Sequence, residues 1–103
     1  MDTDFVRKRI TQLRMEKGVS EYQMSLDMGH SRSYIQSIVS GKSLPSMTEF
    51  LYMCEYLGVT PSAFFDEQMK NPALLQKVID EMRSLPDKDI LSLLSLIERF
   101  KEK

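Results

Sequence analysis

Residues 19–41 read VSEYQMSLDMGHSRSYIQSIVSG, and this stretch decides the fold. Ser20 can cap a first helix, Glu21 to about Met28, because its hydroxyl can accept hydrogen bonds from the free N–H groups of the opening turn. Gly29 stands where a residue with positive φ commonly ends a helix. The chain then restarts at once, with Ser31 as the cap of a second helix. The pattern predicts two short helices joined by a tight turn.

The predicted second helix has one apolar and one polar side. Ile35 and Ile38 lie three residues apart on the apolar side, and Gly41 ends the helix. The polar side carries side chains that can all form hydrogen bonds: Arg32, Ser33, Gln36, Ser37 and Ser40. Such a side suits the base edges of DNA, and it is also what a solvated surface helix presents. The rest of the chain decides between these two interpretations.

Most of the remaining chain also has helical patterns. A helix over about residues 4–17 ends at Gly18. A helix over about residues 47–57 begins after Ser46, which with Glu49 forms an S-x-x-E capping box. The sequence therefore predicts a helix on each side of the opening stretch.

A short fifth helix follows, with Thr60 as its cap and Pro61 at its first position. Helical spacing assigns one set of apolar positions to a common core. These positions are Val6, Ile10, Leu13, Phe50, Leu51, Cys54, Leu57, Ala63, Phe64 and Phe65. Five helices of this size make a complete small unit.

Length and composition exclude several classes of protein. The 103 residues suit one compact domain, or a small domain with an appendage, and 42% of them are hydrophobic. No apolar run is long enough to span a bilayer, and no signal peptide is visible, so we expect a cytoplasmic protein without a membrane partner. Cys54 and His30 are each the single residue of their type, which leaves no disulfide framework, metal cluster or nucleophile–base pair. We expect neither an enzyme nor a cofactor or metal.

Charge is distributed unevenly along the chain. The whole sequence has 14 basic and 15 acidic residues, for a formal net charge of −1. Residues 1–45 hold seven basic against five acidic side chains, whereas residues 46–103 hold seven against ten. Positive charge therefore gathers around the predicted second helix, although the excess is small and predicts modest non-specific affinity for nucleic acid.

The order of caps, glycines and apolar positions from RKRITQLRMEKG through GVTPSAFF resembles the phage repressor and Cro-type (XRE-type) helix-turn-helix family, over about residues 5–66. The resemblance implies an all-α fold, with a five-helix lambda-repressor-like domain over residues 1–66 and the motif at residues 21–40. It also implies a transcriptional regulator, associated with the nucleoid, that binds double-stranded DNA. The side chains implied to face bases are Arg32, Ser33, Gln36 and Ser37. Those implied to lie near the DNA backbone are Glu21, Tyr22, Ser31, Tyr34, Ser40, Lys42 and Ser43.

Physical chemistry supports two of these roles best. Arg32 can donate two parallel hydrogen bonds to guanine, and Gln36 can pair with adenine, each worth about 1–3 kcal/mol of discrimination. A phosphate contact by Arg32 is an equally good interpretation. Glu21 departs from the family, since many members have a donating glutamine there, and an ionised carboxylate cannot donate to a phosphate. Val39 replaces a glutamate that pairs with Arg14 in many relatives, so Arg14 is expected to reach solvent or a phosphate.

The chain changes character after the fifth helix. Residues 67–71 are predicted to form a hinge, and residues 72–103 to form a helical hairpin whose last helix runs to about Phe100. The apolar stripe of its first helix is Leu74, Leu75, Val78, Met82 and Leu85. In the last helix, Ile90, Leu94 and Ile97 can face the hairpin partner, and Leu93, Leu96 and Phe100 are left partly outside as a dimer interface. The alternative is that the hairpin folds back on its own domain.

Two function classes remain open. The first is a dimeric repressor on a palindromic operator, with half-sites about one DNA turn, near 34 Å, apart. The second is an antitoxin-like or partner-controlled module whose C-terminal hairpin binds another protein. An enzyme is poorly supported, because the sequence has no glycine-rich phosphate loop and no convergent catalytic residues.

Overall fold

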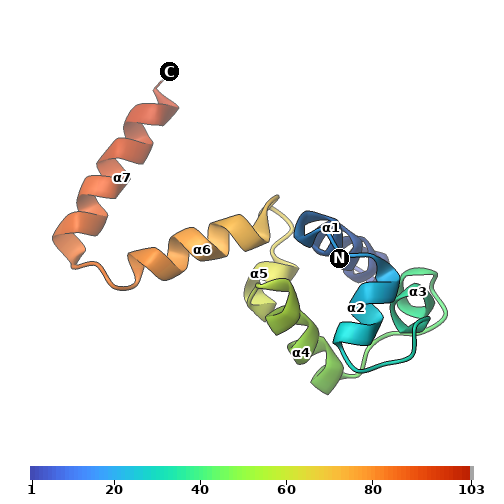
Figure 1. The fold of residues 1–103 in the computed structure, drawn as a ribbon. Coiled ribbons are helices and arrows are strands. Elements are labelled where there is room, and N and C mark those ends of the chain that lie inside the picture. Colours follow the sequence, from blue (N-terminus) through green and yellow to red (C-terminus); the bar gives the residue numbers. More distant parts are fainter. Residues whose placement is uncertain (103) are drawn as a thin grey trace.

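The computed structural model describes residues 1–102, which are helical or connect helices (Figure 1). The seven helices in this part of the chain are α1 (Thr3–Lys17), α2 (Glu21–Asp27), α3 (Tyr34–Val39), α4 (Met47–Leu57), α5 (Pro61–Phe65), α6 (Pro72–Met82) and α7 (Asp87–Lys101). The predicted all-α class, with a helix-turn-helix domain at the N-terminal end, is confirmed. None of these helices is long and apolar enough to cross a membrane.

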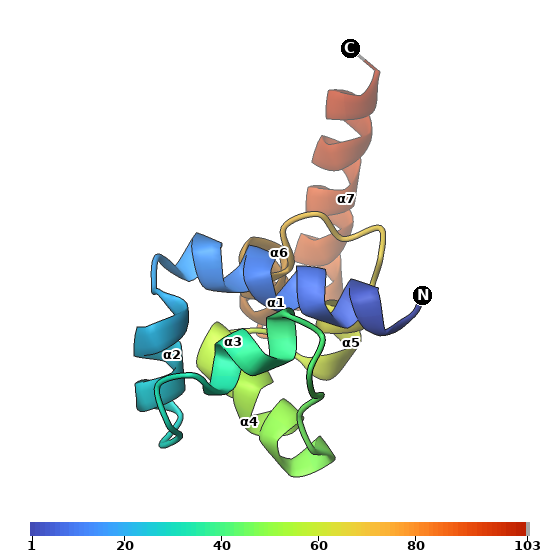
Figure 2. The same cartoon turned by 90° about the vertical axis from the view of Figure 1, so that its right-hand side faces the viewer.

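The helices form a body and an arm. Helices α1–α5 surround one core, whereas α6 leads away from it and α7 turns off at a wide angle (Figure 1). The same extension of α7 beyond the body is visible in the perpendicular view (Figure 2). The molecule measures 48 × 26 × 23 Å, and α3 and α7 lie toward its two ends.

Local capping explains why the body helices begin where they do. The hydroxyls of Ser20, Ser46 and Thr60 accept from the backbone N–H three residues later, at 2.9, 3.1 and 3.1 Å. Each hydroxyl satisfies one of the N–H groups that the first turn of a helix leaves unpaired. Gly18 and Gly58, in the left-handed conformation, end α1 and α4. These starts and ends agree with the sequence prediction.

The core joins all five body helices. Phe64 of α5 is fully buried and meets Phe50 of α4 edge to face, with ring centroids 4.9 Å apart. The other buried apolar residues are Ile10, Leu13, Met24, Met28, Ile35, Ile38, Met53, Cys54, Leu57, Val59 and Ala63. Two predicted core positions are wrong, because Leu51 and Phe65 are 48% and 38% exposed. Phe65 follows Phe64 on a helix, so its side chain points about 100° away and covers Phe50 from outside.

A buried arginine holds the chain after α5 against α1. Arg9 is only 5% exposed. Its guanidinium donates to the carbonyl oxygens of Phe64 and Met69, both at 3.0 Å, and to the carbonyl oxygen of Asp66. Gln12 donates to the Lys70 carbonyl. Residues 67–71, predicted to be a hinge, are therefore tied to α1, although the division of the chain at that segment stays a prediction.

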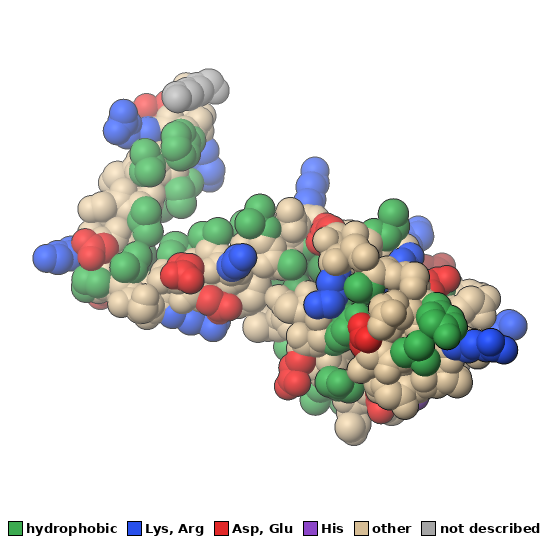
Figure 3. Space-filling model, in the orientation of Figure 1, with side chains coloured by type: hydrophobic (Ala, Val, Ile, Leu, Met, Phe, Trp, Pro, Cys, Tyr) green, Lys and Arg blue, Asp and Glu red, His purple; other side chains and the backbone are tan. Residues whose placement is uncertain are grey.

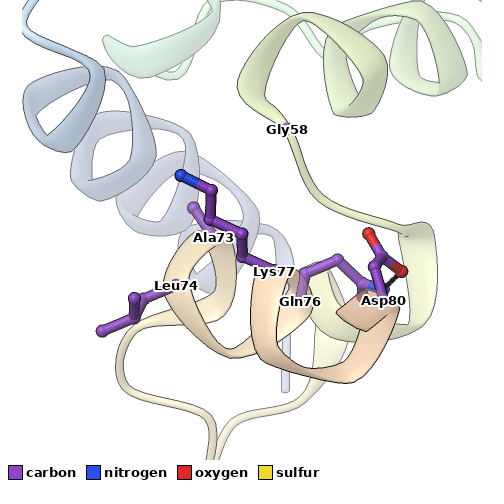
Figure 4. A pocket seen from close by; sticks show the side chains of 6 residues that line it. All are labelled: Gly58, Ala73, Leu74, Gln76, Lys77 and Asp80. Carbon is purple, nitrogen blue, oxygen red and sulfur yellow. Dashed lines mark hydrogen bonds between the residues drawn. The ribbon is translucent and has the colours of Figure 1, made fainter. Parts of the chain in front are cut away.

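The first half of α6 continues the body. Pro72 is fully buried, and Gln76, 7% exposed, accepts from Thr60 at 3.1 Å and donates to Asp80 at 2.9 Å. Figure 4 shows Gln76 and Asp80 beside Gly58, in a shallow cleft that the body forms with α6. Gln76 links Thr60 of the body to Asp80 within this cleft, so the cleft is part of how α6 is attached.

Helix α7 does not pack against α6, although the sequence predicted that the two would form a hairpin. Ile90, Leu94 and Ile97, expected to face α6, are 36, 48 and 46% exposed, and no residue of α7 is buried. The alternative that α7 folds back on the body is contradicted by the same exposure.

The starts of α6 and α7 agree with the prediction, because proline and asparagine act locally there. Helix α6 ends at Met82, so Leu85, predicted to extend its stripe, lies in the turn before Pro86. The angle between α6 and α7 depends on contacts that one chain does not make.

Candidate nucleic-acid interface

One buried serine fixes α3 against α2. Ser25 is fully buried, and its hydroxyl donates to the Glu21 carbonyl at 2.7 Å and accepts from the Ile35 N–H at 3.0 Å. The second bond satisfies a donor in the first turn of α3 that would otherwise be buried without a partner. Sequence reasoning missed Ser25. The available signal was its position beside Met24 on the buried side of α2.

The second helix of the motif starts later than predicted. It begins at Tyr34, and Ser33 occupies the position before it without forming a side-chain cap. Ser31 is not the cap, so that prediction is wrong; its backbone oxygen accepts from the Tyr34 N–H at 3.1 Å in a turn. Because this turn takes up Arg32 and Ser33, both lie in the connection, exposed, just before α3.

The predicted base-facing residues form a mostly exposed surface. Arg32, Ser33 and Gln36 are exposed, and Ser37 is half-buried. Ser37 also supports the loop that follows α3, because its carbonyl accepts from Lys42 N at 3.0 Å and its hydroxyl lies 3.2 Å from that of Ser43. The long side chains with free hydrogen-bonding groups at this surface are therefore Arg32 and Gln36.

The end of α3 is held by α1. Arg7 donates from Nε to the Ile38 carbonyl at 3.0 Å, where the helix would otherwise leave an acceptor unpaired. Ser25 and Arg7 thus fix α3 at its two ends. A helix that reads DNA needs this rigidity, because base recognition depends on hydrogen-bond geometry.

Comparison with known proteins agrees with this geometry. A family model described as helix-turn-helix matches residues 10–64, which is just over half of the chain and runs from α1 to α5. The chain belongs to the Cro/C1-type (XRE) helix-turn-helix family. No curated protein and no solved structure matches it. The helix-turn-helix domain of this XRE-type chain is that of a DNA-binding regulator.

Only some cations of the XRE domain are available to DNA. Lys8, Arg32 and Lys42 are exposed, and their side chains make no ion pair or hydrogen bond within residues 1–102. By contrast, Arg7 is bonded to α3 and Arg9 is buried. The positive balance of the N-terminal half is therefore partly used within the fold.

Arg14 bonds to a backbone carbonyl, since the glutamate that pairs with this arginine in many relatives is missing here. It donates to the Val19 carbonyl at 2.8 Å, at the junction of α1 and α2, and its Nε is buried without a partner among the described residues. Val39, which stands where many relatives have the glutamate, is half-buried against the core. Arg14 is thus a structural link in this conformation, and its contact with a phosphate stays a prediction.

The single histidine closes the turn of the motif. Its Nε2 lies 2.8 Å from a Glu49 carboxylate oxygen, and its ring stacks on Tyr34 at 3.8 Å and 9°. Glu49 turns to His30 although it belongs to the predicted capping box, of which the Ser46 half is formed. His30 thus joins α4 to the start of α3.

Three of the residues predicted to contact the DNA backbone differ in how exposed they are. Tyr22, at the start of α2, is 53% exposed, whereas Glu21 is half-buried. The Tyr34 hydroxyl is buried and has no partner within residues 1–102, and burial followed by the nearby Glu49 charge raises the Tyr34 pKa. A phosphate contact by this hydroxyl therefore requires the tyrosine ring to move.

Proposed function

We propose that this protein is a sequence-specific transcriptional regulator that inserts α3 into the DNA major groove. The observation that carries the proposal is exposed Gln36 on α3, with exposed Arg32 in the turn just before it, while Ser25 and Arg7 fix α3 at its two ends. Side chains that can bond a base bidentately, on a rigid support, are what base recognition needs. Because it binds DNA in this proposal, the protein is located in the cytoplasm, associated with the nucleoid.

The remaining polar residues have supporting roles in this proposal. Ser33 and Ser37 approach bases, but a short hydroxyl that both donates and accepts specifies little. Lys42 supplies the charge beside α3 and binds a phosphate. The other proposed backbone contacts are Arg14, Glu21 through its backbone, Tyr22, Ser31, Tyr34, Ser40 and Ser43.

The protein acts as a homodimer and represses by occupying its operator. The side of α7 that carries half-buried Leu93 and exposed Leu96 and Phe100 provides the dimer interface. Two-fold symmetry of the protein requires a palindromic site. Because α3 and α7 lie toward opposite ends of the molecule (Figure 1), half-sites one turn apart or a whole number of turns apart both fit the two-fold arrangement.

Selection of bound fragments from a random DNA pool at physiological salt tests the proposal. We expect enrichment of an inverted repeat, with Arg32→Ala and Gln36→Ala each relaxing preference at a different position of the half-site. Lys77→Ala is the matched control, since it removes an exposed cation on α6 outside the motif. A pool that shows no enrichment with the wild-type protein contradicts sequence-specific binding.

The exposed arm also favours a second candidate, an antitoxin-like or partner-controlled module that holds another protein at α6 and α7. The same apolar side chains that suit a second copy would suit a foreign helix. Purification from the native host separates the two candidates. A stoichiometric protein partner supports the second candidate, and a homodimer without one supports the first.

A further inference from the structure

Helix α7 presents an apolar face that nothing in residues 1–102 covers. Its exposed apolar residues are Ile90 at 36%, Leu91 at 62%, Leu94 at 48%, Leu96 at 41% and Ile97 at 46%. At 100° per residue, Ile90, Leu94 and Ile97 fall on one stripe. A helix of 15 residues is marginal in water without packing, so this stripe needs a partner.

The charges at the two ends of α7 identify that partner. Asp87 and Asp89 outnumber Lys88 in the first turn, and Arg99 and Lys101 outnumber Glu98 in the last, so the first turn is net acidic and the last is net basic. A second α7 laid antiparallel places the acidic end of each helix beside the basic end of the other. A parallel copy would bring acid against acid and base against base. The charge pattern of α7 is therefore complementary to itself in the antiparallel direction.

One charged pair matches in register and in direction. Asp87 and Lys101 each lie seven residues from Leu94, on opposite sides of it along the chain. Fourteen residues return a helix to within about 40° of the same direction, so both side chains lie on the Leu94 side of the centre of the apolar stripe. A two-fold axis across the middle of the helix keeps that edge on one side, which brings Asp87 of each copy beside Lys101 of the other. Neither side chain has an ion-pair partner within residues 1–102.

We propose that α7 pairs antiparallel with α7 of a second copy of this chain, centred near Leu94. This inference rests on the dimer included in the proposed function, and it centres the interface on Ile90, Leu94 and Ile97, with Leu93 and Leu96 along one edge. Leu94 meets the partner's Leu94, and Ile90 lies opposite the partner's Ile97. The charge pairs at both ends and the opposed helix dipoles set the direction.

Helix α6 completes the interface. A 15-residue helix is only about 22 Å long, whereas a stable dimer buries about 800 Å² on each partner. Figure 3 shows apolar side chains on both α6 and α7 along the open angle between them. Leu75 and Val78 of α6 are 40 and 47% exposed, and they receive the C-terminal end of the partner helix.

Cysteine crosslinking of the full chain tests the direction of pairing. Leu94→Cys is expected to crosslink to its own copy with a short thiol reagent. Asp87→Cys and Lys101→Cys are each expected to stay uncrosslinked alone and to crosslink when the two proteins are mixed and refolded together. The natural Cys54 is 1% exposed in the core, which keeps it out of the reaction.

Ser95→Cys is the matched control, because it is adjacent to Leu94 but lies on the opposite side of the helix from the stripe. It is expected to give no dimer. Crosslinking of Asp87→Cys and Lys101→Cys each with itself would show a parallel pair and overturn the proposal. Failure of Leu94→Cys and of the mixture to crosslink would show that α7 does not pair with itself, and would also overturn it.

The DNA selection described above, run on the same proteins, separates this inference from the proposed function. A crosslinked mixture of Asp87→Cys and Lys101→Cys without any enriched DNA leaves the antiparallel pair standing and removes the DNA-reading role. Enriched single half-sites with no crosslink at Leu94 leave the DNA-reading role standing and remove the pair.

Discussion

The body formed by α1–α5 and the arm formed by α6 and α7 satisfy their apolar and polar groups in different ways. In the body, Ile10, Ile35 and Phe64 are fully buried, and long side chains such as Arg9 pair with distant backbone oxygens. In α7 no residue is buried, and the hydroxyls of its serines bond within one turn of the helix. The difference is that the body satisfies its apolar groups within a single chain, whereas α7 leaves its apolar face exposed, which is the face that the proposed second copy would cover.

The largest expected effect is a loss of stability when a core side chain of the body is truncated, compared with the same truncation in the arm. Phe64→Ala should lower the free energy of unfolding by about 3–5 kcal/mol, because it opens a cavity among fully buried neighbours. Leu94→Ala should change it by less than about 0.5 kcal/mol in dilute, monomeric protein, since a half-exposed side chain loses little burial. Urea denaturation of both variants measures this. Equal losses would refute the distinction between body and arm.

A second comparison uses two serines that make the same kind of helical bond. Ser25 and Ser95 each donate to the carbonyl four residues earlier, but only Ser25 also accepts from a buried N–H. Ser25→Ala should therefore cost about 1–3 kcal/mol of stability, because the Ile35 N–H is left without its partner. Ser95→Ala should be nearly neutral. Thermal unfolding at equal concentrations distinguishes the two outcomes.

A third test concerns charge on the body. Lys42→Ala should weaken DNA binding similarly across sequences, and should reduce the slope of log affinity against log salt by about 0.9 for each phosphate that it no longer neutralises. Lys77→Ala on the arm should leave that slope unchanged. Titration of one DNA duplex at several salt concentrations gives both slopes. A slope unaffected by Lys42→Ala would show that this lysine binds no phosphate.

The smallest expected effect depends on pH. Burial, followed by the hydrogen bond to Asp27, raises the pKa of Tyr56 to about 12 from its usual 10.0. The fold therefore favours the neutral phenol, and this contribution is complete below pH 10 and is lost as the pH rises through about 12. Tyr56→Phe keeps the ring and removes the titration. Melting temperatures should fall less in Tyr56→Phe than in the wild type between pH 10 and about 12.

The same pair also predicts behaviour in acid. The hydrogen bond from Tyr56, then that from Gln23, lowers the pKa of Asp27 below 3.8. A carboxylate with a lowered pKa stabilises the fold above its unfolded value, and this contribution is lost as the pH falls through the lower, folded value. Tyr56→Phe should reduce this acid-dependent loss, which the same melting experiment measures below about pH 4.

Local signals account for what the sequence predicted well. The bounds of α1, α4 and α5 follow from caps and glycines that act within one turn, so they can be located without tertiary information. The start of α3 was misplaced because Ser31 and Ser33 are both acceptable caps, and the choice depends on the turn that packs against α2. The family resemblance also lies in these local features, and it is confirmed.

The features missed from the sequence join residues far apart in the chain. His30 and Glu49 are 19 positions apart, and Arg9 and Phe64 are 55 apart. Nothing in the periodicity of a helix shows which distant group its polar side chain will meet. Arg14 illustrates the same limit, since the absence of its glutamate was visible in the sequence but its bond to Val19 was not. The roles of the DNA-contacting residues stay predictions.

The Arg9 bonds have a consequence for how the chain is made. Their acceptors lie at Phe64, Asp66 and Met69, so the guanidinium cannot be satisfied until residues 1–69 of the 103 have left the ribosome. Until then a charged group that belongs in the interior stays in water and favours leaving α1 undocked. We therefore expect the domain to close as one event only after Met69 has been made, and a fragment ending at residue 66 to fold less well than one that includes Gln76.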